Sequence, residues 1–214
     1  MPNFLRSVQD VCIAYYELQE RVSQMISKQP DSIASLEVPH CPKWIVRSVI
    51  SHMVGVPEDV LSGQMDGVTT EAWTQRQVDR HSAQNMSELL AIWHSTVENF
   101  RSVLPNTPQP TISQFVFDQV THEHDIRHAI SQPGARDSQA IEVAESFVRD
   151  FLSRNQDPRI TMLANSPVSG FDFVRSLSGR RSAAQIAEVG LPAEVVVAFI
   201  SSSIFDLPAD TVFE

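Results

Sequence analysis

Apolar residues recur at three- and four-residue spacing along most of the first 156 positions, which predicts a series of amphipathic helices. We expect helices over residues 3–28, 42–54, 86–104, 111–131 and 138–154, and a further helical region from Thr70 through Gln77. Pro42 suits the first turn of the second helix, where a missing N–H is tolerated. That helix continues to Leu61 if the segment Gly55–Pro57 is accommodated by a local adjustment. These elements predict a mainly α fold.

The pattern changes after residue 157. Ile160–Leu163 is short and β-branched and is expected to be a strand, whereas Gly170–Leu177 is expected to be a short helix that stops at Gly179. Val195–Ile200 fits either a helix or a strand. A segment of this size builds a marginal core by itself. We therefore expect a helical bundle over residues 1–156, with residues 157–214 as a small α+β extension packed on it.

Three histidines and two aspartates lie within twelve residues of the helix expected over 111–131. An α-helix turns by about 100° per residue, which places Asp118, His122 and Asp125 on one face together with apolar residues. His124 and His128 fall on the opposite side, where a surface position is the simpler interpretation. The first face is therefore expected to point inward.

His52 lies on the second expected helix, within about 60° of apolar positions on the helical wheel. Two imidazoles (His52 and His122) and the carboxylate of Asp118 would supply three protein ligands for zinc, nickel or ferrous iron, with a position left open for water or substrate. Asp125 would then orient a ligand imidazole.

Simpler interpretations compete with this metal site. A single inward-facing histidine such as His52 is more often a hydrogen-bonded core residue than a ligand. Asp118 and His122 also have the spacing of an ordinary helix pair. If the helix is rotated from the position inferred above, His52, His124 and His128 form an alternative triad.

Composition narrows the possible partners. Of the 214 residues 20% are charged, and the formal net charge is −10, which argues against nucleic acid or an anionic membrane as the main partner. The sequence contains no apolar run of about 20 residues and does not begin with a signal-peptide pattern. Two cysteines, Cys12 and Cys41, suit a reducing compartment. We expect a cytoplasmic protein that could form a homodimer.

Several stretches resemble one family. Cys41-Pro-Lys-Trp-Ile-Val-Arg-Ser-Val-Ile-Ser-His52 resembles a signature of mycothiol-dependent maleylpyruvate isomerase-like proteins, which belong to the DinB/YfiT-like metal-binding superfamily. Asp118-x-x-x-His122-Glu-His-Asp125-Ile-Arg resembles their second signature, and 170–186 resembles a later block that ends in Gly-Arg-Arg-Ser-x-x-Gln-Ile. The ending over 205–214 is also similar. These matches occur in order and span most of the chain.

The resemblance implies a DinB-like four-helix bundle of up-down-down-up topology and a divalent metal, usually zinc. Carried over to this sequence, the implied ligands are His52, Asp118 and His122. Lys43 replaces the glycine that commonly follows Cys-Pro in the family. Asp118 stands where the isomerase is described with a glutamate. Because aspartate is shorter by one methylene, His124 is kept as the alternative third ligand.

The resemblance also implies a small thiol co-substrate, mycothiol or bacillithiol, and a small electrophilic metabolite. This would make the chain a metal-dependent thiol S-transferase or isomerase. Substrate carboxylates would need cationic partners, for which Arg76 and Arg80, or Arg180 and Arg181, are candidates. Cys41 is not expected to be the nucleophile, because nothing near it in the sequence marks a base. Two other classes stay open: a non-catalytic protein that binds a metal or a small molecule, and a structural dimer without a metal.

Overall fold

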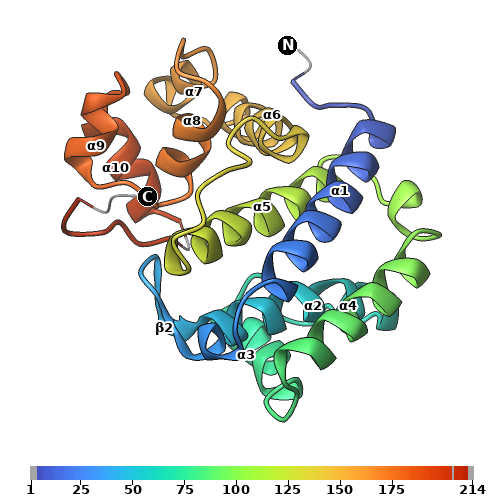
Figure 1. The fold of residues 1–214 in the computed structure, drawn as a ribbon. Coiled ribbons are helices and arrows are strands. Elements are labelled where there is room, and N and C mark those ends of the chain that lie inside the picture. Colours follow the sequence, from blue (N-terminus) through green and yellow to red (C-terminus); the bar gives the residue numbers. More distant parts are fainter. Residues whose placement is uncertain (1–3, 204, 212–214) are drawn as a thin grey trace. The chain divides into compact units, whose positions relative to one another are not determined.

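A computed structural model describes residues 4–203 and 205–211 (Figure 1). The expectation of a mainly α fold is confirmed. The described elements are α1 (Val8–Ser27), η1 (Asp31–Ser35), β1 (Glu37–Val38), β2 (Cys41–Ile45), α2 (Val46–Ser62), α3 (Glu71–Arg80), α4 (Met86–Phe100), η2 (Leu104–Asn106), α5 (Thr111–Ala129), α6 (Gln139–Ser153), α7 (Pro158–Leu163), α8 (Gly170–Leu177), α9 (Ala183–Glu188) and α10 (Ala193–Ser201). Within this part of the chain, no helix combines the length and apolarity needed to cross a bilayer.

The described residues fall into two compact units. The first comprises those within Met1–Tyr15, Pro108–Thr121 and Pro133–Glu214, and the second comprises Tyr16–Thr107 and His122–Gln132. Helices α1 and α5 are continuous in sequence across the division, so each contributes its first part to the first unit and its second part to the second unit. The first helix was predicted to begin at residue 3, which lies outside the described residues. That helix begins at Val8, where the Ser7 hydroxyl accepts a hydrogen bond from the Asp10 N–H.

Helix α2 is the centre of the second unit and packs against α3 and α4. Its core residues, among them Val49 and Met53, are fully buried. Gly55 lies so close to α3 that a Cβ at this position would come within 2.5 Å of the Gln77 Cβ. The glycine therefore allows α3 to approach α2 more closely than any other residue would.

The start of α2 differs from the prediction. Residues 41–45 form strand β2, which pairs antiparallel with β1 in the register Glu37↔Ile45, and the helix begins only at Val46. Pro42 is compatible with this two-stranded hairpin, because a strand that is paired on one side does not need every N–H. The Val46 N–H donates to the Leu36 carbonyl at 2.9 Å and so ties the helix start to the hairpin. Helix α2 then continues through Pro57 to Ser62.

The α+β character expected for the C-terminal extension is wrong for its described part. Residues 160–163 lie in helix α7 and not in a strand, because Asp157 caps the helix through the Arg159 N–H at 2.9 Å and Pro158 occupies its first turn. Helix α8 has the predicted bounds, and Gly179 follows it with a φ of 74°. Residues 195–200 lie in helix α10. The end of the motif over 205–214 lies partly outside the described residues, which stop at 211.

The first unit contains this extension. Helix α6 packs against α7 and α8, and α10 packs against α7, α8 and α9. Phe173, Val174 and Leu177 of α8 are buried. Residues on both sides of position 157 therefore pack within one unit.

Helix α5 starts at Thr111 as predicted and ends at Ala129, two residues before the predicted end. Residues 119–126 are all buried. His124, placed on the outer side by the helical wheel, is only 3% exposed, so the expectation of a surface position is wrong. The wheel assumed one apolar face, whereas residues on every face of α5 between 119 and 126 are buried, and the polar Glu123 among them pairs with Arg21 and Arg127.

Candidate metal centre

Two groups of side chains in the described residues bring three potential metal ligands together. One comprises His52, Asp118 and His122, and the other comprises Cys41, His122 and Asp125. Within each group, one potential ligand atom per residue lies within 4.8 Å of the others. These groupings of histidine, aspartate and cysteine could hold a metal ion, and both contain His122.

His52 and His122 form the centre of the arrangement. His52 lies on α2 and His122 on α5, and their rings meet edge to face with centroids 5.0 Å apart. Both side chains are buried. The Trp44 ring lies against both imidazoles, with centroids 5.3 Å from His52 and 5.9 Å from His122. The imidazoles therefore face each other beside an aromatic wall that limits access of water.

A chain of hydrogen bonds fixes the tautomer of His52. Asp59 accepts from the Gln77 amide Nε2 at 2.7 Å, and the Gln77 Oε1 lies 2.6 Å from His52 Nδ1. An ionised carboxylate can only accept, so the NH₂ group of Gln77 must face Asp59 and its oxygen must face His52. His52 therefore carries its proton on Nδ1 and its lone pair on Nε2. This is the usual arrangement of a histidine that ligates a metal.

Arg80 and Glu58 continue this chain at its outer end. Arg80 donates to both Asp59 and Glu58, and His81 Nε2 lies 2.9 Å from Glu58. Burial raises the pKa of Glu58, but the hydrogen bonds from His81 and Arg80 and their charges outweigh it and hold the pKa below its usual range. Burial lowers the pKa of Arg80, and its two carboxylate partners more than offset this, so that the pKa is raised. Arg80 is thus engaged in holding Asp59.

Asp125 orients His122 in the same way. Its Oδ2 lies 3.2 Å from His122 Nδ1, and Asp125 is fully buried. When Asp125 accepts the Nδ1 proton, the lone pair of His122 is on Nε2. Asp118 precedes His122 by one turn of the same helix and is half-buried. Two imidazole nitrogens and one carboxylate oxygen make up a donor set that suits zinc and other first-row divalent ions.

The other predicted histidines belong to neither group within the part of the chain that the structure describes. His124 is buried in α5. His128, near the end of the helix, has its Nδ1 3.2 Å from His40 Nε2. The group that contains His52 includes Asp118 and does not include His124.

The candidate anion-binding arginines have partners of their own. Arg76 donates to the backbone carbonyls of Asp66 and Ala72. Arg180 is buried and donates to the Ser178 carbonyl at 2.7 Å, with its guanidinium over the Phe205 ring. Arg181 is also buried, and its guanidinium lies over the Phe171 ring.

Cys41 differs from the expectation in two respects. It lies in strand β2 and not at a helix start, and its Sγ lies 3.5 Å from the Asp125 carboxylate, which is a base. This contact could not be predicted from the sequence, because the two residues are 84 positions apart.

Sequence reasoning also missed Gln77, Asp59 and Trp44 as neighbours of the site. Polar residues in helices are usually exposed, so Gln77 and Asp59 carried no signal of their own. Gly55 was the one position that could have indicated these neighbours, because it lies in the middle of an apolar helix, three residues from His52. A glycine at such a position often marks the close approach of another backbone.

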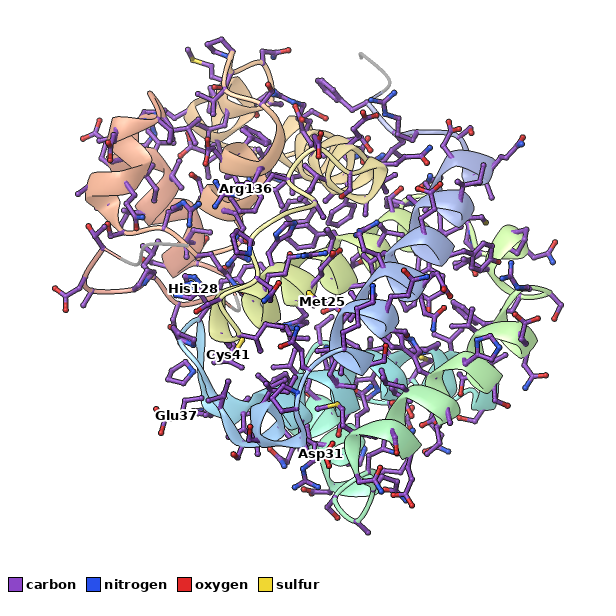
Figure 2. All side chains as sticks on the ribbon, in the orientation of Figure 1. Met25, Asp31, Glu37, Cys41, His128 and Arg136 are labelled. Atoms are coloured by element: carbon purple, nitrogen blue, oxygen red, sulfur yellow. The ribbon has the colours of Figure 1, made fainter. Side chains whose placement is uncertain are left out.

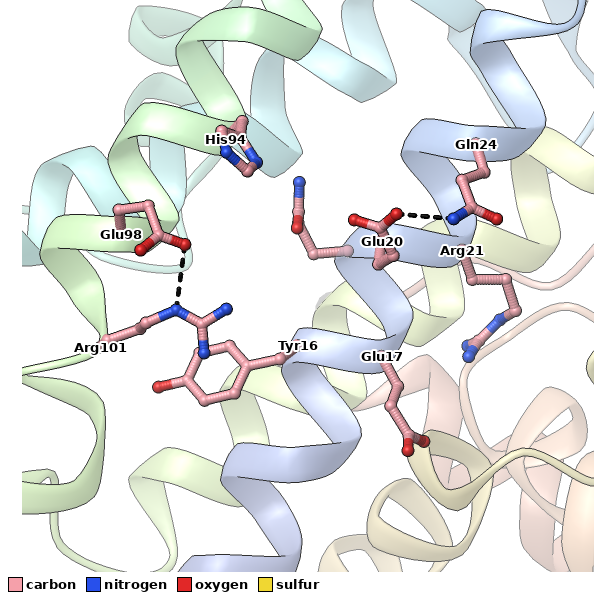
Figure 3. Close-up of a pocket in the computed structure, with 9 residues that line it drawn as sticks. Tyr16, Glu17, Glu20, Arg21, Gln24, His94, Glu98 and Arg101 are labelled. Atoms are coloured by element: carbon pink, nitrogen blue, oxygen red, sulfur yellow. Dashed lines mark hydrogen bonds and ion pairs between the residues drawn. The ribbon is translucent and has the colours of Figure 1, made fainter.

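A separate open cavity of about 430 Å³ lies between α1 and α4 (Figure 3). Glu20 and Tyr16 line it from α1, and His94 and Glu98 line it from α4. Arg101, just after α4, pairs with Glu98 and lies 4.3 Å from the centre of the Tyr16 ring. No residue of the two ligand groups is among the described residues that line it.

Comparisons of the chain with protein-family models, with curated proteins and with solved structures found no match.

Proposed function

We propose that the protein is a metal-dependent enzyme that transfers or adds a small thiol to an electrophilic metabolite, as an S-transferase or isomerase. One observation carries the proposal: two buried imidazoles face each other, and each has a hydrogen-bond partner at Nδ1 that places its lone pair on Nε2. A histidine placed only for core packing does not require this orientation. With Asp118, the pair would hold a divalent ion, most simply zinc.

Neighbouring residues of the chain would hold the two imidazoles in the orientation that binds the ion. A bound divalent ion lowers the pKa of a coordinated thiol, so that a reactive thiolate exists near neutral pH. Gln77 and Asp59 would keep the proton of His52 on Nδ1, and Asp125 would do the same for His122. Trp44 would exclude water from one side of the two rings, which strengthens electrostatic interactions there.

The thiol class is supported by the sequence motifs. His52 ends one stretch that resembles mycothiol-dependent maleylpyruvate isomerase-like proteins, and Asp118 and His122 lie in the second. The proposal therefore includes a DinB-like bundle and mycothiol, or a related thiol, as co-substrate. Arg76 stays a candidate for binding a substrate carboxylate, since its side chain is exposed.

Metal analysis followed by a thiol assay tests the proposal. His122→Ala should lose bound zinc and His52→Ala should bind it more weakly than the native protein, whereas His94→Ala, an exposed histidine on α4, should bind it as the native protein does. The native protein should then consume mycothiol in the presence of an electrophile from a panel that includes maleylpyruvate.

Two results would contradict the proposal in different ways. Undiminished zinc in both histidine variants would remove the metal centre. Bound zinc without thiol consumption across the panel would instead indicate a metal-binding protein that is not an enzyme.

A further inference from the structure

Cys41, His122 and Asp125 form a group of ligand atoms that is held together from two elements of the same unit. Cys41 lies in β2, and the other two residues lie on α5; Figure 2 shows Cys41 beside the last turns of that helix. Asp125 is the middle member, with its Oδ2 3.5 Å from Cys41 Sγ and 3.2 Å from His122 Nδ1. His122 and Asp125 are buried, and Cys41 is half-buried.

These spacings match those of an occupied metal site. With metal–nitrogen and metal–oxygen bonds of about 2.1 Å and a metal–sulfur bond of about 2.3 Å, tetrahedral geometry places nitrogen and oxygen about 3.4 Å apart, and sulfur and oxygen about 3.6 Å apart. The observed 3.2 and 3.5 Å differ from these values by roughly 0.1–0.2 Å. The ligand atoms of Cys41 and His122 lie within 4.8 Å of each other, so an ion could bind all three residues once these two side chains adjust.

We propose that Cys41, His122 and Asp125 form a second metal position, which a thiophilic divalent ion occupies as an alternative to the position at His52 and Asp118. The two positions share His122 but use its two different nitrogens. A neutral imidazole has one lone pair. His122 can therefore serve one ion at a time, through Nε2 in the first position and through Nδ1 in the second.

Occupation of the second position balances in protons and charge. Cys41 releases its thiol proton to solvent and binds as a thiolate, and the His122 proton moves from Nδ1 to Nε2. One proton is released for each ion bound. The thiolate and the Asp125 carboxylate together neutralise a divalent cation, whereas the first position supplies one carboxylate. Thiolate ligands favour soft ions such as cadmium and the borderline zinc.

Cobalt(II) is the probe for this position, because a cobalt–thiolate bond gives an intense charge-transfer band in the near ultraviolet. His52→Ala leaves only the second position intact, and this variant should bind one cobalt per chain and show the band. Cys41→Ser in the same background should remove the band. Cys12→Ser, at the other cysteine, should leave it unchanged.

A measurement on the native chain does not depend on the folding of any variant. Excess cadmium should slow alkylation of Cys41 by iodoacetamide at least tenfold, as read from the mass of the Cys41 peptide. The proposal is overturned if the band is absent from His52→Ala, if it survives Cys41→Ser, or if cadmium does not protect Cys41. Two cobalt ions per native chain would contradict the sharing of His122.

The inference of a second metal position rests on the proposed function only through His122. Different experimental results would contradict the second position and the proposed enzyme. Visible cobalt bands without the thiolate band would leave the first position standing and overturn the second. A thiolate band that persists in His52→Ala, in a protein that never consumes mycothiol, would support the second position and contradict the enzyme.

Discussion

At the scale of single residues, the site depends on which atom carries each proton. Gln77 contributes no ligand, yet its amide oxygen determines that the His52 lone pair is on Nε2. Asp59 in turn determines the orientation of that amide. Partners of this kind, behind the ligands, typically change metal affinity by about 10–100-fold when they are removed.

Gln77→Ala should therefore weaken zinc binding by about 10–100-fold while leaving all three proposed ligands in place. A competition titration against a chromophoric chelator measures the change. Gln75→Ala is the matched control, because Gln75 is exposed on the same helix and bonds Asp79. Equal affinity in the native protein and Gln77→Ala would show that the hydrogen bond to His52 has no role in the site.

Glu58, at the outer end of this chain of hydrogen bonds, makes part of the folding stability depend on pH. Its pKa is lowered in the folded protein, so the unfolded chain takes up protons first as the pH falls. The stabilisation from Glu58 is complete above its unfolded pKa of about 4.3 and is lost as the pH drops through the lower folded value.

The Tm of Glu58→Gln should accordingly lie below that of the native protein at pH 6, and the difference should shrink toward zero in strongly acidic buffer. Thermal unfolding followed by circular dichroism across this range measures both. A difference that stays constant with pH would mean that the charge of Glu58 does not matter and that the variant acts through packing alone.

At the scale of elements, the contact between α2 and α3 decides whether Gln77 reaches His52. Gly55→Ala would gain about 1 kcal/mol of helix propensity. The new Cβ would, however, lie 2.5 Å from the Cβ and 3.3 Å from the Cα of Gln77. Those atoms belong to the base of a side chain and to the backbone, so α3 itself must move, and overpacking of this kind typically destabilises by about 1–3 kcal/mol.

We expect Gly55→Ala to lower the free energy of unfolding by about 1 kcal/mol, after the propensity gain is subtracted, and to weaken zinc binding as Gln77→Ala does. Urea unfolding and the chelator competition measure the two effects. Ser62→Ala, at the exposed end of α2, should change neither. A more stable Gly55→Ala protein with native zinc affinity would contradict the close approach of the two helices.

Helix α5 shows how far elements could be predicted from sequence. Its start at Thr111 and the inward direction of His122 followed from spacing. The burial of all residues from 119 to 126 did not follow, because Glu123 is fully buried against Arg21 of α1 and Arg127 of α5, at 2.6–2.9 Å. A carboxylate is almost never fully buried without a partner, and the Arg21 partner is 102 positions away in sequence.

At the scale of the whole molecule, the spacing of apolar residues was enough to predict a mainly α fold. Contacts between residues far apart in the sequence, and the cap of one helix, determined the features that were missed. Strand β2 was missed because its partner, β1, has only two residues and no pattern of its own. Helix α7 was missed because the β-branched residue Ile160 lies behind a capping aspartate and a proline, and the cap determined the structure. The group of His52, Asp118 and His122 could be named in advance because each of them lies on an apolar helix face, whereas the roles of Gln77, Asp59 and Cys41 depend on tertiary contacts.

Metal binding should also appear in the stability of the whole chain. An ion that binds the folded state and not the unfolded state stabilises by RT ln(1 + [L]/Kd), or about 4 kcal/mol at a free concentration of 1,000 times Kd. Zinc at this excess should therefore raise the Tm of the native protein by about 8–16 °C, since a domain of 150–250 residues shifts by about 2–4 °C per kcal/mol.

His122 belongs to both proposed positions, so His122→Ala should abolish this shift. Removal of one position alone, by His52→Ala or by Cys41→Ser, should reduce the shift without eliminating it. Differential scanning calorimetry with and without zinc, and again after addition of a chelator, separates these results. A full shift in His122→Ala would place the ion elsewhere in the molecule and contradict both positions together, because each depends on that imidazole.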